Sequence, residues 1–298
     1  MTDPCLTDPG SSAARRAGVA RPERPAHARA PEGLAQWLSS IDPAAEPAVR
    51  LVTIDGQICV IKRRRPSLGR GVSYALRYVR ASALGLGCKV FLGEWPAPGV
   101  LLNNGLAHEA RRLAQLDHAH WRVPEVWSYR PGELVLEYVG KDLPGMLRRA
   151  DEAGRRTLID HVAHELVAFH RQGLWHGGAQ VRNLTWHDEA IWRIDFEENI
   201  GSALSLPLAQ AYDVYQCLSS LVALRGLPVE QAEALGDQLL ATYIEQGEDP
   251  GVQAALRRMA RMICGAARVL APVLGWVPGR DVQGFFRVAR TLRLILKS

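Results

Sequence analysis

Residues 174–201, LWHGGAQVRNLTWHDEAIWRIDFEENIG, carry the strongest structural signal in the chain. The apolar segments LTW and IWRI suit two short strands, and the polar HDEA between them suits a turn. This hairpin brings together Asn183 and Asp195, which are twelve positions apart. Asp195 lies between Ile194 and Phe196, and a charge at such a buried strand end needs a partner or a metal ion. The stretch therefore predicts a polar site beside a β-hairpin.

The part of the chain before this stretch begins with strands. VRLVTI and QICVIKR flank Asp55-Gly56, a pair that favours a tight hairpin turn. Residues 104–116 repeat apolar side chains on one helical face, which predicts a helix. Two further short strands are expected within residues 122–140.

The rest of the chain combines a polar tail with a long helical region. Residues 1–31 have too few large apolar side chains to offset the entropy of ordering, which predicts a disordered tail. Residues 155–172 predict a long helix ended by Gly173, and from residue 208 onwards nearly every segment has helical periodicity. We expect a β-rich half and a helical half that join near residues 139–145.

Composition narrows the class of protein. The 36 Lys and Arg residues against 31 Asp and Glu residues suit phosphate-bearing ligands or an anionic membrane surface without requiring either. Five scattered cysteines without a Cys-x-x-Cys spacing indicate neither zinc nor a disulfide framework, so a reducing cytoplasm fits best. We find no signal-peptide core and no apolar run of the roughly 18–20 residues that a membrane-spanning helix needs.

The order of these features resembles the protein-kinase-like fold. More narrowly, it is similar to the bacterial lipopolysaccharide kinases, which phosphorylate Kdo or core heptose sugars. The resemblance spans residues 50–225 as an order of motifs. It implies a two-lobed α+β fold, with a small β-rich N-lobe over residues 32–140 and a larger helical C-lobe over residues 141–298. It also implies ATP and Mg²⁺ as cofactors.

In the N-lobe, the resemblance assigns four residues to ATP binding. Lys62 ends an apolar strand, as in the Val-Ala-Ile-Lys pattern whose lysine contacts phosphates and pairs with a helix glutamate, here Glu109. Glu137 and Val139 would offer backbone groups to adenine. Without the resemblance, Lys62 is interpreted as a solvated strand end and Glu109 as a surface charge on a helix. Glu137 and Val139 are then part of an ordinary edge strand. No glycine-rich phosphate loop precedes Lys62, where the only turn glycine is Gly56.

In the C-lobe, the resemblance assigns a metal site and the loop beside it. Asn183 and Asp195 would hold Mg²⁺, because hard cations require oxygen ligands. His176 would organise the backbone of the catalytic loop, and Asp213 would brace that loop from a helix. The alternative for Asn183 is an ordinary turn residue, and the alternative for Asp195 is an aspartate at a strand edge. For Asp213 it is an aspartate on a helix surface.

The catalytic loop departs from the family pattern. Gly178 stands where the family has its catalytic aspartate. Gln180 would orient the acceptor hydroxyl, and Arg182 would bind the transferred phosphate. Equally, Gln180 is explained as an ordinary polar loop residue and Arg182 as a partner in a salt bridge. Glu197 replaces the glycine of the Asp-Phe-Gly motif, and Glu198 follows it. These two carboxylates either add metal affinity or face solvent.

We expect an atypical ATP-dependent phosphotransferase acting on a saccharide or a lipid-linked sugar in the cytoplasm. The alternative is a pseudokinase, a nucleotide-binding regulatory module without turnover. Basic residues in the stretch 62–80 and in the last helix, RVARTLRLILKS, suggest peripheral contact with the inner face of an anionic membrane. A nucleic-acid partner is not expected, because no stripe of alternating basic and aromatic residues is present.

Overall fold

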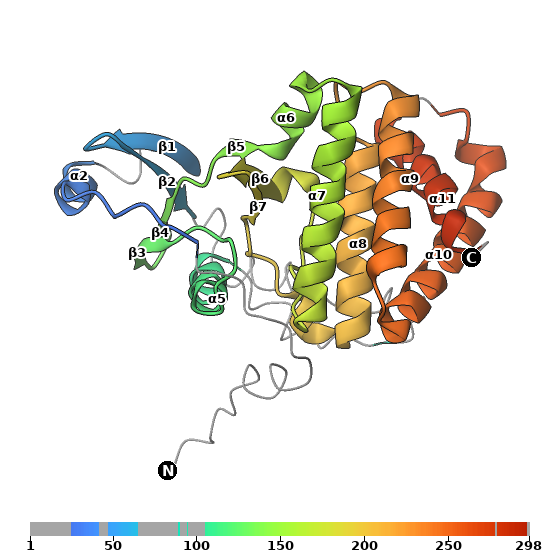
Figure 1. Cartoon of the computed structure of the whole chain (residues 1–298), viewed down its shortest axis with the longest axis horizontal. Coiled ribbons are helices and arrows are strands. Elements are labelled where there is room, and N and C mark those ends of the chain that lie inside the picture. The colour runs from blue at the N-terminus through green and yellow to red at the C-terminus, as the bar shows by residue number, and fades with distance from the viewer. Residues whose placement is uncertain are drawn as a thin grey trace, which may run out of the picture.

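The structure is a computed structural model, and it describes residues 25–41, 47–64, 89, 94, 105–277 and 279–296. Figure 1 shows a small body of strands, accompanied by α2 and α5, beside a larger stack of helices. The predicted two-lobed α+β architecture is confirmed. Most of the expected N-terminal tail, and the expected basic stretch beyond Arg64, lie outside the described residues.

The smaller lobe is built on a four-stranded antiparallel sheet with the strand order β1-β2-β4-β3. Its strands are β1 (Val49–Ile54), β2 (Gln57–Arg63), β3 (Val126–Arg130) and β4 (Glu133–Glu137). The predicted hairpin joins β1 to β2, with Asp55 at φ 50° and Gly56 at φ 79°. Both angles are left-handed, as a tight hairpin turn requires, and Asp-Gly tolerates them at low cost.

Strand β4 is apolar on both faces because each face is covered by a helix. Val135 packs in a cluster with α2 (Leu34–Ser40). Its neighbours Leu134 and Leu136 point to the other face and pack in a cluster with α5 (Leu106–His118). This apolar contact holds α5 in a defined position against the sheet, and α5 carries one of the predicted site residues.

A second, small sheet has the strand order β5-β6-β7. Its strands are β5 (Lys141–Asp142), β6 (Leu184–His187) and β7 (Ala190–Arg193). The predicted hairpin is present, and its turn residues Asp188 and Glu189 have φ angles of 48° and 57°. Because Leu184 pairs with Arg193, the residue before β6 and the residues after β7 leave the hairpin at the same end.

The larger lobe is a helical assembly whose elements pack in layers in Figure 1. Its α-helices are α6 (Leu143–Arg149), α7 (Glu152–Arg171), α8 (Leu206–Val222), α9 (Val229–Gln246), α10 (Pro250–Leu274) and α11 (Arg280–Leu292). Short 3-10 helices are η1 (Val181–Asn183), η2 (Ile200–Ala203) and η3 (Leu294–Leu296). Helix α7 begins earlier than predicted because the carboxylate of Asp151 accepts the N–H of Gly154 at 2.8 Å and caps it.

The end of the chain packs onto this lobe. Val288 and Leu292 of α11 are buried, and so is Ile295 of η3. Fully burying one such side chain stabilises the fold by roughly 1.5–3 kcal/mol. Among the described residues, no helix has the length and apolar character to span a membrane.

Candidate active site

Three charged side chains from three elements meet between the lobes. Lys62 of β2 places its Nζ 2.7 Å from Oε1 of Glu109 on α5, and 2.8 Å from Oδ1 of Asp195, which follows β7. The side chain of Glu109 is fully buried, that of Lys62 is 11% exposed, and that of Asp195 is 39% exposed. Lys62 and Glu109 thus form the expected ion pair, and Asp195 shares the same cation.

The charge states follow from burial and proximity. Burial by itself lowers the pKa of Lys62, but the attraction of Glu109 and Asp195 outweighs it and holds that pKa above its ordinary value. Burial raises the pKa of Glu109 to about 7, although Lys62 opposes this shift. Lys62 is therefore a fixed positive charge between the two carboxylates.

Asp195 is held in an uncommon backbone conformation. Its φ of 67° is left-handed, which costs a non-glycine residue free energy and persists only when the surroundings impose it. Before it, the N–H of Ile194 donates to the carbonyl oxygen of Asn183 at 2.9 Å. After it, the buried ring of Phe196 stacks on His176 with a centroid separation of 4.1 Å. These contacts aim the carboxylate at Lys62.

The oxygen atoms around Asp195 suit a divalent metal ion. Asn183 donates from Nδ2 to the carbonyl of Gly178 at 2.8 Å, which leaves its amide oxygen on the other side of the group. Carboxylate oxygens of Glu109, Asp195 and Glu197 lie within 4.8 Å of one another. Oε2 of Glu109 is buried without a hydrogen-bond partner among the described residues. Such hard oxygen donors fit Mg²⁺.

Asp213 of α8 holds the loop that begins at Trp175. Its buried carboxylate accepts the N–H of His176 at 2.5 Å and that of Gly177 at 2.8 Å, and it faces Nε2 of His170 at 3.4 Å. Burial alone would raise the pKa of Asp213, but these partners together hold it below its ordinary value. The carboxylate therefore stays charged and braces the loop, as the resemblance implied.

His176 plays a structural part. The N–H of Gly178 donates to Nδ1 at 3.2 Å, so the proton of the ring is on Nε2, which donates to the carbonyl oxygen of Ile194 at 3.1 Å. Burial lowers the pKa of His176 to about 4. The neutral imidazole links the loop to the strand that leads into Asp195.

The remaining loop residues predicted to act on the acceptor are less constrained. Nε2 of Gln180 donates to Oε1 of Gln216 on α8 at 3.3 Å, so this amide is already engaged. Arg182 is exposed to solvent. Glu198, for which the sequence left open a metal or a solvent role, is exposed and has its carboxylate beside Gly178. Although the residue as a whole is exposed, its carboxylate lies against buried Gly178. Loss of solvation there, followed by repulsion from Asp195, raises the pKa of Glu198.

The two residues predicted to face adenine lie at the end of β4 and just beyond it. Glu137 and Val139 are both buried. The N–H of Glu137 donates to the carbonyl oxygen of Glu125 at 3.0 Å. Its carboxylate is occupied by the N-terminal segment, because Nδ1 of His27 lies 2.6 Å away and the N–H of Ala28 donates at 2.7 Å. The segment that leads into α2 thus packs against this connection between the lobes.

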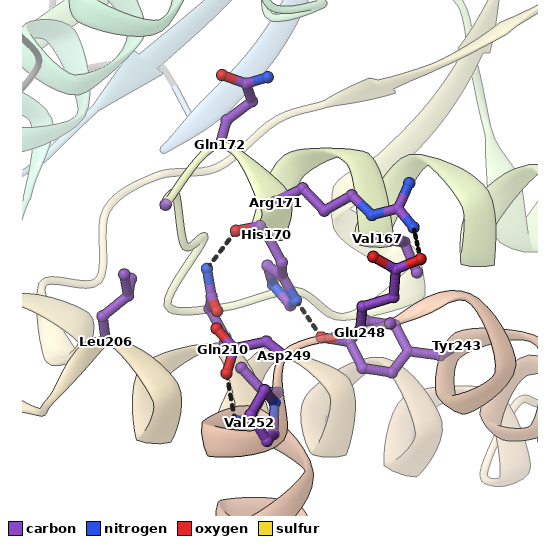
Figure 2. Close-up of a pocket in the computed structure, with 13 residues that line it drawn as sticks. Val167, His170, Arg171, Gln172, Leu206, Gln210, Tyr243, Glu248, Asp249 and Val252 are labelled. Atoms are coloured by element: carbon purple, nitrogen blue, oxygen red, sulfur yellow. Dashed lines mark hydrogen bonds and ion pairs between the residues drawn. The ribbon is translucent and has the colours of Figure 1, made fainter. Parts of the chain in front are cut away.

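A separate cavity of about 640 Å³ lies in the helical lobe, and Figure 2 shows its lining. Nδ1 of His170 lies 2.7 Å from the hydroxyl of Tyr243, and Arg171 pairs with Glu248 at 3.7 Å. The described residues that line this cavity include none of the site residues predicted from the sequence. His170 links the cavity to the catalytic loop, because it also contacts Asp213.

The sequence did not decide the roles of Glu197 and Glu198, and it gave no indication of a role for His27. Glu197 joins the carboxylate cluster and also accepts a hydrogen bond from Arg64 at 2.7 Å, and Glu198 lies beside Gly178. The acidic pair directly after the Asp-Phe dipeptide was the available signal for both. His27 was missed because it belongs to a polar segment of low complexity, which gives no such signal.

These features are typical of the protein-kinase-like fold: a sheet lysine paired with a helix glutamate, and a loop asparagine joined by a hairpin to an aspartate. Within that class, the family model of the RIO domain, an atypical kinase family, matches residues 100–204. The match includes Glu109, the catalytic loop and Asp195, but not Lys62. None of the curated proteins compared matches the chain.

Several solved structures are similar to the chain at low identity. One is a MAP kinase from Leishmania major, at 14% identity, with 87% of this chain and 80% of that chain covered and a TM-score of 0.36. The Rv3197–erythromycin complex from Mycobacterium tuberculosis has 17% identity, coverages of 84% and 71%, and a TM-score of 0.35. The bifunctional kinase-methyltransferase WbdD has 18% identity, coverages of 70% and 46%, and a TM-score of 0.34.

Proposed function

We propose that the chain is an atypical kinase that transfers the γ-phosphoryl group of ATP to a hydroxyl group of a saccharide or a lipid-linked sugar. The observation that carries the proposal is the cation of Lys62 held between Glu109 and Asp195. Burying a lysine between two carboxylates costs desolvation free energy. Binding of the phosphates of ATP would explain why the protein keeps this arrangement.

Each residue of the cleft has a part in this reaction. Lys62 would bind the phosphates of ATP, and Glu109 would keep its ammonium group aimed at them. Asn183 and Asp195 would hold Mg²⁺, which supplies charge neutralisation on the transferring phosphoryl group when bound. Val139 would contribute backbone contacts to adenine, together with Glu137. His176 and Asp213 would keep the loop in place, and Arg182 would attract the phosphate.

The choice of a sugar acceptor rests on the motif order shared with the lipopolysaccharide kinases. The transition state of phosphoryl transfer is largely dissociative, so positioning and charge stabilisation provide most of the acceleration. A loop without an aspartate at position 178 is therefore compatible with turnover. The alternative function, a pseudokinase that binds nucleotide without transfer, is favoured by Gly178 itself.

Nucleotide binding is tested first by calorimetry with ATP, in the presence and absence of Mg²⁺. We expect magnesium-dependent binding by the wild type and its loss in Asp195→Asn. Asp188→Asn, the same change in the exposed turn of the same hairpin, should bind like the wild type. Absence of magnesium-dependent binding by the wild type would refute both the kinase and the pseudokinase.

Phosphate transfer is tested next, with labelled ATP and a panel of saccharide, lipid-linked and protein acceptors. Transfer by the wild type to a sugar, abolished in Asp195→Asn, supports the proposal. Transfer to proteins alone would replace the sugar acceptor with a protein. Binding of nucleotide by a wild type that is inert with every acceptor would establish the pseudokinase.

We also propose peripheral contact with an anionic membrane. The surface expected for it, formed by residues 62–80 and the last helix, stays a prediction, because residues 65–80 lie outside the described residues. Arg63 pairs with Glu133 and Arg64 with Glu197, so these basic residues are engaged within the protein. A second surface is formed by the end of α10 and the turn after it. The exposed fractions of Val269, Val273 and Trp276 are 74%, 64% and 78%, and these residues have the spacing of one helical face. Residues 250–280 contain no acidic residue and five arginines, which complements an anionic surface that accepts an apolar helix face.

Vesicle co-sedimentation tests this surface. Wild type should bind vesicles that contain anionic lipid, weaken with salt, and lose binding in Val273→Ala/Trp276→Ala, while Tyr129→Ala on β3 should bind normally. Binding unaffected by the double substitution would refute the contact. Absence of vesicle binding, together with a dimer that the double substitution dissociates, would assign this face to a second copy of the chain.

A further inference from the structure

The space left by the missing aspartate is bordered by another carboxylate. A Cβ atom placed on Gly178 would lie 3.7 Å from Oε2 of Glu198 and 3.7 Å from Nδ2 of Asn183. In the kinase-like fold, a side chain at position 178 reaches the acceptor hydroxyl. The carboxylate of Glu198 therefore lies in van der Waals contact with the point where the side chain of an aspartate at 178 would begin.

The backbone around Glu198 is fixed against the catalytic loop by two glycines. A Cβ on Gly177, whose φ is 87°, would lie 2.9 Å from the carbonyl oxygen of Glu198, so the two segments approach more closely than a side chain allows. A Cβ on Gly201 would overlap the ring of Trp175. Contact on both sides of residues 198–201 sets the position of Glu198 relative to the loop.

Other groups near the acceptor position are less suited to receive a proton. Gln180 cannot act as a base and already donates to Gln216. Glu197 faces Arg64 instead. Glu198 is exposed, as a group that must meet an incoming hydroxyl has to be.

We propose that Glu198 is a catalytic residue that replaces the missing loop aspartate by orienting the acceptor hydroxyl and receiving its proton. This inference rests on the proposed function. In the step, the hydroxyl oxygen forms a bond to the γ-phosphorus while the bond from that phosphorus to the β–γ bridging oxygen breaks. The hydroxyl proton passes to the carboxylate of Glu198, ADP departs with the bridging oxygen, and the proton is later released to water.

The experiment removes the carboxylate at position 198 and restores one at position 178. Its probe is ATP hydrolysis, in which water is the acceptor, and it compares wild type, Glu198→Gln, and Glu198→Gln combined with Gly178→Asp. An aspartate at 178 is sterically permitted, because its Cβ would lie no closer than 3.7 Å to the neighbouring side chains and no left-handed φ is required. Glu152→Gln, an exposed change at the start of α7, is the matched control.

We expect Glu198→Gln to lower kcat by about 100- to 10,000-fold, the usual worth of a general base, with unchanged magnesium-dependent ATP affinity by calorimetry. Adding Gly178→Asp should recover at least part of this loss, whereas Glu152→Gln should hydrolyse like wild type. Loss of ATP affinity in Glu198→Gln, or failure of Gly178→Asp to recover any activity in a folded double variant, would overturn the role.

The two levels of the hypothesis fail differently. An active wild type matched by an equally active Glu198→Gln overturns the role of Glu198 alone and leaves the kinase in place. A wild type that neither hydrolyses ATP nor transfers phosphate to any acceptor overturns the proposed function, and the role of Glu198 with it.

Discussion

The proposed nucleotide side and the proposed acceptor side of the candidate site place their charges in different ways. On the nucleotide side, Lys62, Glu109 and Asp195 come from β2, α5 and the end of β7, and they are held by apolar packing around them. On the acceptor side, Arg182 and Glu198 are exposed and lie outside the α-helices and strands. Buried charges must keep their partners, whereas exposed groups can be exchanged between neighbouring segments at little cost in stability.

The largest loss of unfolding free energy is expected when the buried ion pair of Lys62 and Glu109 is removed. Lys62→Met leaves the fully buried carboxylate of Glu109 without its cation, and loss of one partner of such a pair costs about 3–5 kcal/mol of unfolding free energy. Magnesium-dependent ATP binding should also disappear. Chemical denaturation and calorimetry measure the two effects. The matched change Lys141→Met on exposed β5 should be nearly neutral, and equal stabilities of the two variants would contradict the comparison.

The loop between the two sides should show an intermediate effect. In Asp213→Asn the amide nitrogen faces the N–H of either His176 or Gly177, and one buried donor loses its acceptor, which costs about 1–3 kcal/mol. ATP hydrolysis should fall more than ATP affinity, because the loop moves while Lys62 stays. Thermal unfolding and kinetics test this. A variant with wild-type stability would show that the brace does not hold the loop.

A smaller, pH-dependent effect is expected at His27. Its ring faces Glu137 and Asp117 and packs edge-on against Trp192. The hydrogen bond with Glu137, opposed by burial, raises the pKa of His27 above its ordinary 6.5. Because the folded-state pKa is raised, the stabilisation is complete below the ordinary value and is lost as the pH rises through the raised pKa.

The variant His27→Asn measures this contribution. Wild type should exceed it in unfolding free energy by about 1 kcal/mol in mildly acid solution, and the difference should shrink at alkaline pH. Denaturation curves over a pH series give both values. A difference that grows with pH would show that the imidazole is neutral in the folded protein.

The smallest effect is expected at an exposed ion pair. Arg156 and Glu152 lie one turn apart on α7, and their side chains are 62% and 68% exposed. Arg156→Ala should change the unfolding free energy by only about 0.3–0.5 kcal/mol, and the change should vanish at high salt. Denaturation at two salt concentrations measures it. A loss comparable to that of Lys62→Met would remove the distinction between buried and exposed charges.

Local pattern was sufficient to predict the elements that carry the site. The hairpin at Asp55-Gly56, the helix with Glu109 and the hairpin before Asp195 all formed where turn chemistry and apolar periodicity predicted them. The start of α7 was missed because a cap at Asp151 extends it beyond its apolar stripe. The roles of the predicted site residues stay predictions until the measurements above are made.

By itself, the sequence determined the two hairpins, the helix that carries Glu109 and the helical character of the second half, because periodicity and turn preferences are local properties of the chain. Only the tertiary structure decided that His27 contacts Glu137 and that Glu198 lies beside Gly178. Contacts of this kind depend on how separate segments pack against one another, and residues 27 and 137 are 110 positions apart. No local pattern encodes a distance between atoms that meet only when the chain is folded.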